Sequence, residues 1–272
     1  MAELPEIAKL AGQMRETLCG KTIQTVTLLQ EKCANVPAGE FQGRVGGAAI
    51  TGVRYKGKWI VTALGNGENI LLSLGMGADV AFFEDEKSAP EKYQVMLRFT
   101  DGSGYTARFW WFGKFLLVPD KELPLEPNTG GIAMDPFDEG FTMEYFTRLL
   151  QGKKTQVKAF LMEQRNVGGI GNMYMHDILF KARLHPQKKI SDMSGEEAER
   201  LYGSIIEVLA LSRERGAFAY ESDFFGQKGG FTMDCFLVGY KEGQPCPVCG
   251  EAIIQIKTGG TAAYICPACQ RI

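Results

Sequence analysis

The chain has 272 residues, of which 45% are hydrophobic and 11% aromatic, and it carries a formal net charge of −2 with a pI of about 5.9. This length accommodates one large domain or two medium ones beside a small module, and the composition supplies a hydrophobic core. No run of 18 apolar residues is present to span a membrane, and the charge gives no global argument for a nucleic-acid partner.

The first 130 residues predict one helix followed by eight strands. Apolar residues recur at helical steps from Ile7 to Leu18, and Gly20 ends the pattern. The segments with strand character are 22–29, 49–55, 59–64, 70–74, 79–83, 93–99, 105–110 and 114–118. Short strands separated by turns such as Gly65-Asn66-Gly67 favour an antiparallel sandwich or barrel.

The second half of the chain changes character. Residues 119–140 are rich in Pro, Gly, Asp and Glu and predict a hinge, and the pattern from 141 to 215 is helical. Ser194 with Glu197 three residues later forms a capping box that predicts a helix start. Residues 216–232 are rich in Gly and Phe, lack a period and predict a long loop.

A basic stretch lies in the helical region. Five basic residues and one acid, Glu163, occur in it. The basic residues are Arg148, Lys153, Lys154, Lys158 and Arg165. A solvated helix face explains this stretch, and a phosphate-binding face is the alternative. Taken alone, the stretch favours the solvated face.

Glycines crowd the segment 166–174, where Gly168, Gly169 and Gly171 precede Asn172. They allow the backbone to approach a ligand closely, and the N-terminus of the following helix exposes amides. Asn172 can cap that helix or donate its side-chain amide to a phosphate oxygen. A tight corner between helices explains the glycines equally well, and the local sequence does not decide between the two.

Four cysteines near the C-terminus form two Cys-x-x-Cys pairs, Cys246 with Cys249 and Cys266 with Cys269. Four thiolates at about 2.3 Å suit tetrahedral zinc and leave no open coordination position. Two disulfides or a redox pair are the alternatives, but the chain shows no signal peptide and a redox pair needs no duplicate. We therefore expect one structural zinc ion. The remaining cysteines indicate reduced thiols in a cytoplasmic setting: Cys19, Cys33 and Cys235.

Three separate features of the sequence occur in the same order in one family. Ala2-Glu3-Leu4-Pro5-Glu6, the glycine-rich turn with Asn172 and the four-cysteine finger resemble formamidopyrimidine-DNA glycosylase and endonuclease VIII. The similarity covers essentially the whole chain. Supporting matches are Lys58, Leu74-Gly75-Met76, Phe112-Gly113 and Leu161-Met162.

The resemblance implies an α+β fold in three parts. These are a β-sandwich domain at 1–130, a helix-two-turn-helix domain with a lesion loop at 131–230 and a zinc finger at 231–272. It also implies that a monomer binds double-stranded DNA with a damaged or abasic site in a cleft between domains. Flipping and excision of an oxidised base would then be followed by strand cleavage, in a cytoplasmic protein associated with the nucleoid.

The resemblance places the chemistry at the N-terminus. The α-amine of Ala2, exposed once Met1 is removed, would attack C1′ of the damaged nucleotide and form a Schiff base. An α-amine has a pKa of about 7.7 to 8.0, so about a tenth of it is a free nucleophile at pH 7. Glu3 would transfer protons, Glu6 would support the N-terminal geometry, and Lys58 would contact phosphate and assist.

Further positions correspond to residues with which the family contacts DNA phosphates. Lys158 and Asn172 match such residues, whereas Thr261 stands where the family usually has an arginine in the zinc-finger hairpin. A charge-assisted phosphate clamp is therefore missing at this position, and Lys257 could replace it from a different place.

The family also fills the gap left by the flipped base. Met76 and Phe112 match residues with this role, while Trp110 and Trp111 stand in place of an arginine pair. A tryptophan can stack between bases but cannot hydrogen-bond the orphaned base as arginine does. Packing in the core is the alternative role for these tryptophans.

Two functions are compatible with these residues. The first is an active glycosylase and AP lyase with Ala2 in place of the family's usual proline nucleophile. The second is a catalytically weak or inactive paralogue that binds damaged, bent or branched DNA. A zinc-ribbon interaction protein unrelated to DNA would require the ordered motifs to be coincidental.

Overall fold

The computed structural model describes residues 2–272, which form two compact units. The first unit contains the residues up to Gly131 together with Gly216–Gly230. The second contains Ile132–Arg215 and Phe231–Ile272. The sequence-based division groups 216–230 with the helices, whereas the structure assigns this segment to the first unit. The expected α+β class is confirmed.

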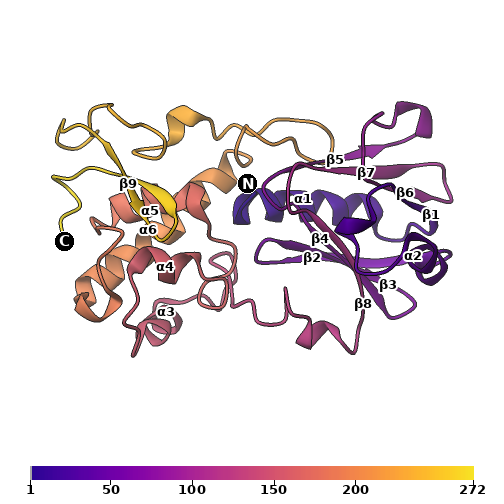
Figure 1. Ribbon diagram of the computed structural model, residues 1–272, viewed down its shortest axis with the longest axis horizontal. Helices are drawn as coiled ribbons and strands as arrows, with labels where there is room; N and C mark the ends of the chain where they lie inside the picture. Colours follow the sequence, from indigo (N-terminus) through magenta and orange to yellow (C-terminus); the bar gives the residue numbers. More distant parts are fainter. Residues whose placement is uncertain (1) are drawn as a thin grey trace. The chain divides into compact units, whose positions relative to one another are not determined.

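The first unit holds helix α1 (Leu4–Leu18) and two four-stranded antiparallel sheets (Figure 1). One sheet has the order β1-β6-β7-β5 and the other β2-β3-β4-β8. Their strands are β1 (Ile23–Leu28), β2 (Ile50–Lys56), β3 (Trp59–Leu64), β4 (Glu68–Ser73), β5 (Ala78–Phe83), β6 (Val95–Phe99), β7 (Gly104–Phe109) and β8 (Lys114–Pro119). All eight predicted strands are present in this sandwich.

Helix α1 supplies the core of this unit with one apolar face. Ile7, Met14 and Leu18 are fully buried, and the helix contacts β2 and β3. The apolar residues recur every three to four positions, so they lie on one side of the helix. This packing fixes the start of α1, where the candidate catalytic residues lie.

The sequence analysis did not predict helix α2 (Ala38–Val45). It contains two glycines and buries only Phe41 and Val45, so its helical pattern is weak. Phe41 stacks on Phe115 of β8, with ring centroids 5.2 Å apart. A tertiary contact therefore stabilises a helix that local propensity does not specify. Three short 3-10 turns complete the unit: η1 (Glu31–Cys33), η2 (Glu86–Ser88) and η3 (Leu123–Leu125).

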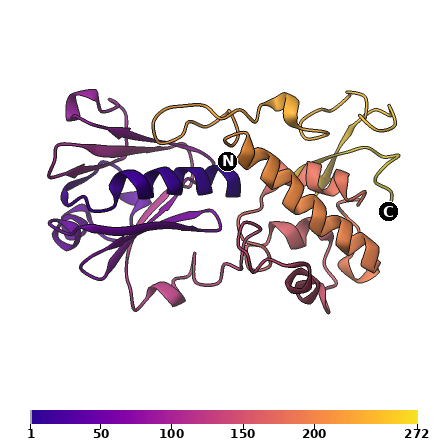
Figure 2. The ribbon, with the colours of Figure 1, turned by 180° about the vertical axis from the view of Figure 1, so that it is seen from behind.

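The second unit is helical and ends in a hairpin. Its elements are α3 (Met143–Leu150), α4 (Val157–Met162), α5 (Asn172–Lys181), η4 (Ile190–Asp192), α6 (Gly195–Glu214), η5 (Met233–Cys235), β9 (Ile254–Thr258) and β10 (Thr261–Ile265). Figure 2 shows α6 as the long helix of this unit. The predicted capping box is present, because Ser194 Oγ accepts from Glu197 N at 3.2 Å and Glu197 Oε2 accepts from Ser194 N at 2.9 Å.

The segment 216–230 is attached to the first unit by side chains and by backbone. Phe224 is fully buried in the core of that unit, and its carbonyl accepts from Phe82 N on β5 at 2.9 Å. Gln13 of α1 bonds both Asp223 and the Phe224 amide, at 2.9 and 3.0 Å. These contacts bring a loop that lies late in the sequence to the first helix.

None of the helices in the described range 2–272 is both long and apolar enough to cross a membrane.

Candidate active site and DNA interface

The residues at the start of α1 are buried and held in one conformation. Ala2 is 3% exposed and Glu3 is fully buried. Glu3 occupies the cap position before the helix, and its backbone N–H donates to Glu6 Oε2 at 2.9 Å. Pro5, in the first turn, has no N–H to leave unpaired, and the charge of Glu6 is favourable at a helix N-terminus. The local sequence therefore builds a rigid N-terminus.

Glu6 also holds the segment 216–230 at this point. Its second oxygen, Oε1, accepts from the backbone N–H of Phe218 at 3.0 Å. One carboxylate thus connects the backbone that follows Ala2 to the segment 216–230.

Glu221 is a buried carboxyl group in this neighbourhood that the sequence analysis missed. It is 8% exposed, and burial raises its pKa, with the nearby negative charges of Asp79 and Glu3 acting in the same direction. Segment 216–232 has no period in the sequence, so only its tertiary attachment shows that this carboxyl group is near Glu3.

Lys58 lies in the tight turn between β2 and β3. Lys56 pairs with Trp59 across the hairpin, and Gly57 adopts a positive φ of 56° that this turn requires. Lys58 is half-buried, and within residues 2–272 it makes no hydrogen bond or ion pair. Its ammonium group is therefore available to a ligand.

Two loops of the first unit present large exposed apolar side chains. Met76 is 50% exposed, Trp111 67% and Phe112 79%. The loops are joined where Met76 N donates to Trp111 O at 2.9 Å. Gly75 has a positive φ of 58°, and a Cβ there would lie 2.1 Å from Trp111 O, so the close approach requires glycine.

Trp110 differs from the exposed Trp111 and Phe112 because its side chain contacts other residues of the first unit. It is half-buried, and its ring contacts Tyr220 edge to face at a centroid distance of 5.5 Å. Its indole N–H lies 3.5 Å from Asp79 Oδ2. Core packing, the alternative role considered for the tryptophans, fits Trp110 better than Trp111.

The glycine-rich turn of the second unit positions Asn172 at the first residue of α5. Gln164 braces the turn, donating to Ile170 O and accepting from Gly169 N, both at 2.8 Å. A Cβ at Gly168 would lie 2.5 Å from Ala133 O. Gly168 therefore serves packing, while Asn172 remains half-buried with its side chain toward the hairpin β9–β10.

The hairpin brings Thr261 to Asn172. Thr261 is exposed, and its hydroxyl donates to Asn172 Oδ1 at 3.3 Å. Lys257 is exposed on the neighbouring strand, paired with Ala262. The structure thus brings together Asn172 and Thr261, two positions at which the family contacts DNA phosphates.

Lys158 lies beneath this hairpin. It is 2% exposed, and its ammonium group donates to the carbonyls of Thr258, Thr261 and Ala262 at 3.1, 3.1 and 3.0 Å. Burial lowers its pKa to about 8. An ammonium group has three donors, and all three are used here. This arrangement differs from the phosphate contact expected from the sequence and makes Lys158 a support of the hairpin.

The four cysteines of the two Cys-x-x-Cys pairs converge. The sulfur atoms of Cys246, Cys249, Cys266 and Cys269 all lie within 4.8 Å of one another. Three of the separations are 3.9, 3.4 and 3.5 Å, close to the roughly 3.8 Å of a tetrahedral zinc site with bonds of about 2.3 Å. The four thiolates fit one structural zinc ion, which they hold at the base of the hairpin.

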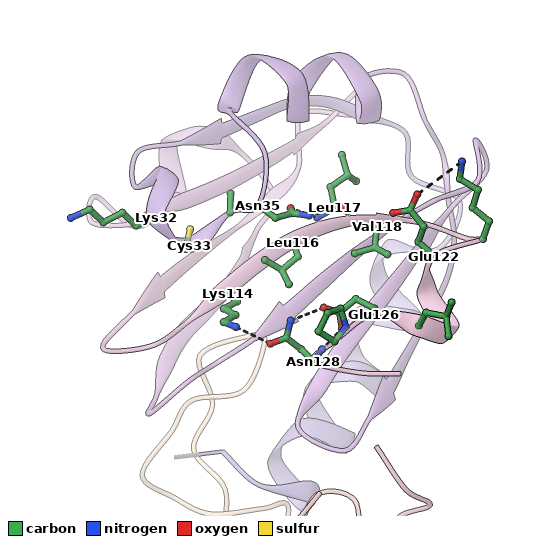
Figure 3. Close-up of a pocket in the computed structure, with 14 residues that line it drawn as sticks. Lys32, Cys33, Asn35, Lys114, Leu116, Leu117, Val118, Glu122, Glu126 and Asn128 are labelled. Carbon is green, nitrogen blue, oxygen red and sulfur yellow. Dashed lines mark hydrogen bonds and ion pairs between the residues drawn. The ribbon is translucent and has the colours of Figure 1, made fainter. Parts of the chain in front are cut away.

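A pocket of about 630 Å³ lies elsewhere on the first unit, beside β8 (Figure 3). Lys114 donates to Asn128 Oδ1 at 2.8 Å, and Glu126 accepts from Asn128 Nδ2 at 2.6 Å. None of the candidate catalytic or DNA-contacting residues lines this pocket.

Comparison with known proteins agrees with this fold. Residues 1–110 match the family model for the formamidopyrimidine-DNA glycosylase N-terminal domain, and residues 132–222 match that for its H2TH domain. Residues 243–272 match a zinc finger found in FPG and IleRS. The fold and site thus define a DNA-repair glycosylase architecture with a structural zinc finger.

Individual relatives are similar over their whole length. A formamidopyrimidine-DNA glycosylase of Brevibacillus brevis is 31% identical, covering 100% of this chain and 99% of its own. Lactococcus lactis Fpg in complex with DNA containing an abasic site superposes with a TM-score of 0.89 at 25% identity, covering 100% of both chains. The same protein with DNA containing N7-benzyl-Fapy-dG gives a TM-score of 0.90 at 25% identity, covering 99% of this chain and 100% of its own. The chain belongs to the formamidopyrimidine-DNA glycosylase family.

Proposed function

We propose that this protein is a DNA glycosylase with an AP lyase step, and that the α-amine of Ala2 is its nucleophile. The observation that carries the proposal is the start of α1, where Ala2 and Glu3 are buried and Glu6 fixes the backbone of Glu3 at 2.9 Å. Family membership supports the enzymatic activity. The related structures with abasic-site and Fapy-dG DNA support damaged double-stranded DNA as the substrate.

The proposed reaction begins when removal of Met1 frees the amine. The nitrogen lone pair of Ala2 forms a bond to C1′ as the bond from C1′ to the base breaks. The base leaves with the electron pair of the broken bond and takes up a proton. Glu3 protonates the ring oxygen, the ring opens, and the amine loses a proton to form a Schiff base. Loss of a proton from C2′ then expels the 3′ phosphate and cleaves the strand.

Positive charge and neutral donors would hold the DNA backbone. The ammonium group of Lys58, which makes no hydrogen bond or ion pair within the described residues 2–272, is a candidate phosphate contact on the first unit. Asn172 and Thr261 are candidates on the second unit, with Lys257 exposed nearby. Lys158 supports them from beneath by holding the hairpin.

Met76, Trp111 and Phe112 are proposed to fill the space that a flipped base leaves. They protrude from two loops that the bond from Met76 N to Trp111 O joins. Trp110 would support these loops through Tyr220. Stacking of aromatic rings on bases contributes about 1 to 3 kcal/mol per base and requires no charge. This fits a protein whose net charge is −2.

We further propose that the protein acts as a monomer on the nucleoid in the cytoplasm. The sulfur atoms of the four C-terminal cysteines converge as they do around a metal ion, which supports a reducing compartment where zinc rather than a disulfide joins these thiols. Branched or gapped DNA is a further candidate ligand under the non-catalytic alternative, which predicts binding without strand cleavage.

A cleavage assay tests the proposal. Protein shown by intact mass to lack Met1 should excise a formamidopyrimidine base from a duplex and should nick an abasic duplex. Glu3→Gln should lose base excision while retaining DNA affinity, because it loses the proton donor and keeps its size. The control is Glu16→Gln, an exposed glutamate of the same helix. Tight binding of the lesion duplex without excision or nicking would establish the non-catalytic alternative.

A further inference from the structure

His176 is fully enclosed beside the candidate phosphate site. It is 1% exposed, four residues after Asn172 on α5. The rings of Tyr240 and Tyr264 meet it edge to face at centroid distances of 5.5 and 5.1 Å. These contacts fix the plane of the imidazole, so each ring nitrogen faces one defined neighbour.

The two ring nitrogens have different partners. The backbone N–H of Tyr264 in β10 donates to Nδ1 at 3.3 Å. Nε2 lies 3.4 Å from the side-chain amide of Asn172. Burial lowers the pKa of His176 to about 3, and the charge of Lys158 acts in the same direction, so the ring is neutral at pH 7.

The partner of Nδ1 determines the tautomer. A backbone N–H can only donate, so Nδ1 must be the acceptor and the single ring proton must be on Nε2. An Nε2–H group then faces Asn172 and requires an acceptor there. A side-chain amide can turn by 180° to offer its oxygen, whereas the backbone of Tyr264 cannot change its role.

We propose that His176 is a positioning residue, which holds Asn172 with its amide oxygen toward the imidazole and its amide nitrogen toward a DNA phosphate. The inference rests on the proposed function of Asn172 as a phosphate contact. In the structure, Thr261 Oγ lies 3.3 Å from Asn172 Oδ1. When the amide is turned by 180°, its nitrogen takes the place of this oxygen and faces Thr261 Oγ. The hydroxyl of Thr261 then accepts from the amide and turns its own hydrogen outward.

The consequence is a site with two neutral donors. Asn172 contributes an amide hydrogen and Thr261 a hydroxyl hydrogen, both available to phosphate oxygens. A phosphate held in this way releases few counterions, so this contact adds affinity with little salt dependence. The arginine expected by family resemblance at the position of Thr261 would add charge instead.

The tautomer is tested by NMR on full-length zinc-loaded protein with ring-¹⁵N histidine. The chain has two histidines, and His185→Gln assigns the signals of the other. We expect His176 to carry its proton on Nε2 and to remain neutral from about pH 6 to about pH 8. A proton on Nδ1 would overturn the proposal.

DNA affinity tests the role. The probe is a duplex with an uncleavable abasic-site analogue. Asn172→Ala should weaken binding roughly threefold to tenfold, the loss of one neutral hydrogen bond. His176→Leu should produce a similar loss, and His176→Gln should restore most of the affinity because its side-chain amide offers a donor near Nε2. The double variant His176→Leu/Asn172→Ala should be no weaker than Asn172→Ala.

Zinc content and melting temperature must match the wild type in each variant that is compared. If Asn172→Ala weakens binding but His176→Leu does not, the positioning role is wrong and the phosphate site stands. If His176→Leu and His176→Gln weaken binding equally, His176 acts through packing and the positioning role is also wrong. If Asn172→Ala has no effect, the proposed phosphate site itself is wrong, and the inference is wrong with it.

Discussion

Lys158 shows how a charged residue can have a structural role beside a site that we propose to bind phosphate. Its three hydrogen bonds to hairpin carbonyls at 3.0 to 3.1 Å occupy every donor of the ammonium group. The sequence analysis assigned this residue to DNA because it lies where the family has a phosphate-contacting lysine. Burial cannot be inferred from the basic stretch around it, since its neighbours Lys153 and Lys154 are exposed.

The lowered pKa of Lys158 predicts a specific pH dependence. Its pKa is about 8 in the folded chain and about 10.4 in the unfolded chain, so between these values the unfolded chain holds a proton that the folded chain has released. The contribution of Lys158 to the free energy of unfolding should therefore rise with pH across this window, so the wild type should gain stability relative to Lys158→Met as the pH rises. Denaturant unfolding at several pH values measures it, with Lys154→Met as the exposed control. Parallel curves for wild type and Lys158→Met would contradict the prediction.

Replacing Thr261 with arginine tests whether this residue lies beside a DNA phosphate. Thr261→Arg should tighten DNA binding by about 1.5 to 3 kcal/mol, because a guanidinium group makes a charge-assisted bond to phosphate. The slope of log affinity against log salt should steepen by about one phosphate contact. Gln255→Arg, which adds the same charge to the exposed side of β9, is the matched control. Equal effects of the two variants would mean that general charge, not a phosphate at Thr261, produces the gain.

The elements of the first unit could be predicted closely from the sequence. Strand boundaries agree within a few residues because alternating side chains and glycine turns mark them locally. Helix α2 was not predicted, since its stability comes from Phe41 stacking on Phe115 of a distant strand. The attachment of segment 216–230 was not predicted either, because Phe224 finds its partners Phe82 and Tyr105 only in the folded chain.

The candidate site likewise contains residues that the sequence identifies and roles that only the folded structure shows. Ala2, Glu3, Asn172 and the four cysteines stand in local motifs, so the sequence shows them as candidates. The roles that depend on distant partners, such as the bond from Tyr264 to His176, leave no local pattern.

Substitution of Trp111, in one of the two exposed loops, should weaken DNA binding and leave the stability of the protein nearly unchanged. Trp111 is 67% exposed, so Trp111→Ala should change the free energy of unfolding by less than about 0.5 kcal/mol. Loss of stacking should weaken binding to a lesion duplex by about 1 to 3 kcal/mol. Thermal unfolding and fluorescence anisotropy measure the two quantities, with Leu125→Ala, a change of another exposed apolar residue, as the control. Unchanged affinity would exclude Trp111 from the DNA interface.

At the scale of the whole molecule, one metal ion stabilises the hairpin that carries Thr261. Cysteine thiolates occupy all four positions of the zinc, so the ion has a structural role and offers no site for catalysis. Its removal should affect DNA binding through the hairpin rather than through the chemistry at Ala2.

We therefore expect one zinc per chain, and we expect Cys249→Ser to lose the metal, lower the melting temperature and weaken DNA binding. Cys235→Ser, which changes a cysteine outside the cluster, should retain both metal and affinity. Metal analysis by mass spectrometry and thermal unfolding provide the measurements. Full DNA affinity in zinc-free Cys249→Ser protein would show that the hairpin does not contribute to binding.

The central claim is that the Ala2 amine performs the chemistry. It is tested most directly by borohydride trapping on an abasic-site duplex, with intact mass and peptide mapping on the same sample. A covalent adduct on the Ala2 nitrogen, in protein that lacks Met1, is the result we predict. The absence of an adduct from protein shown to lack Met1, or an adduct that maps to Lys58, would contradict it.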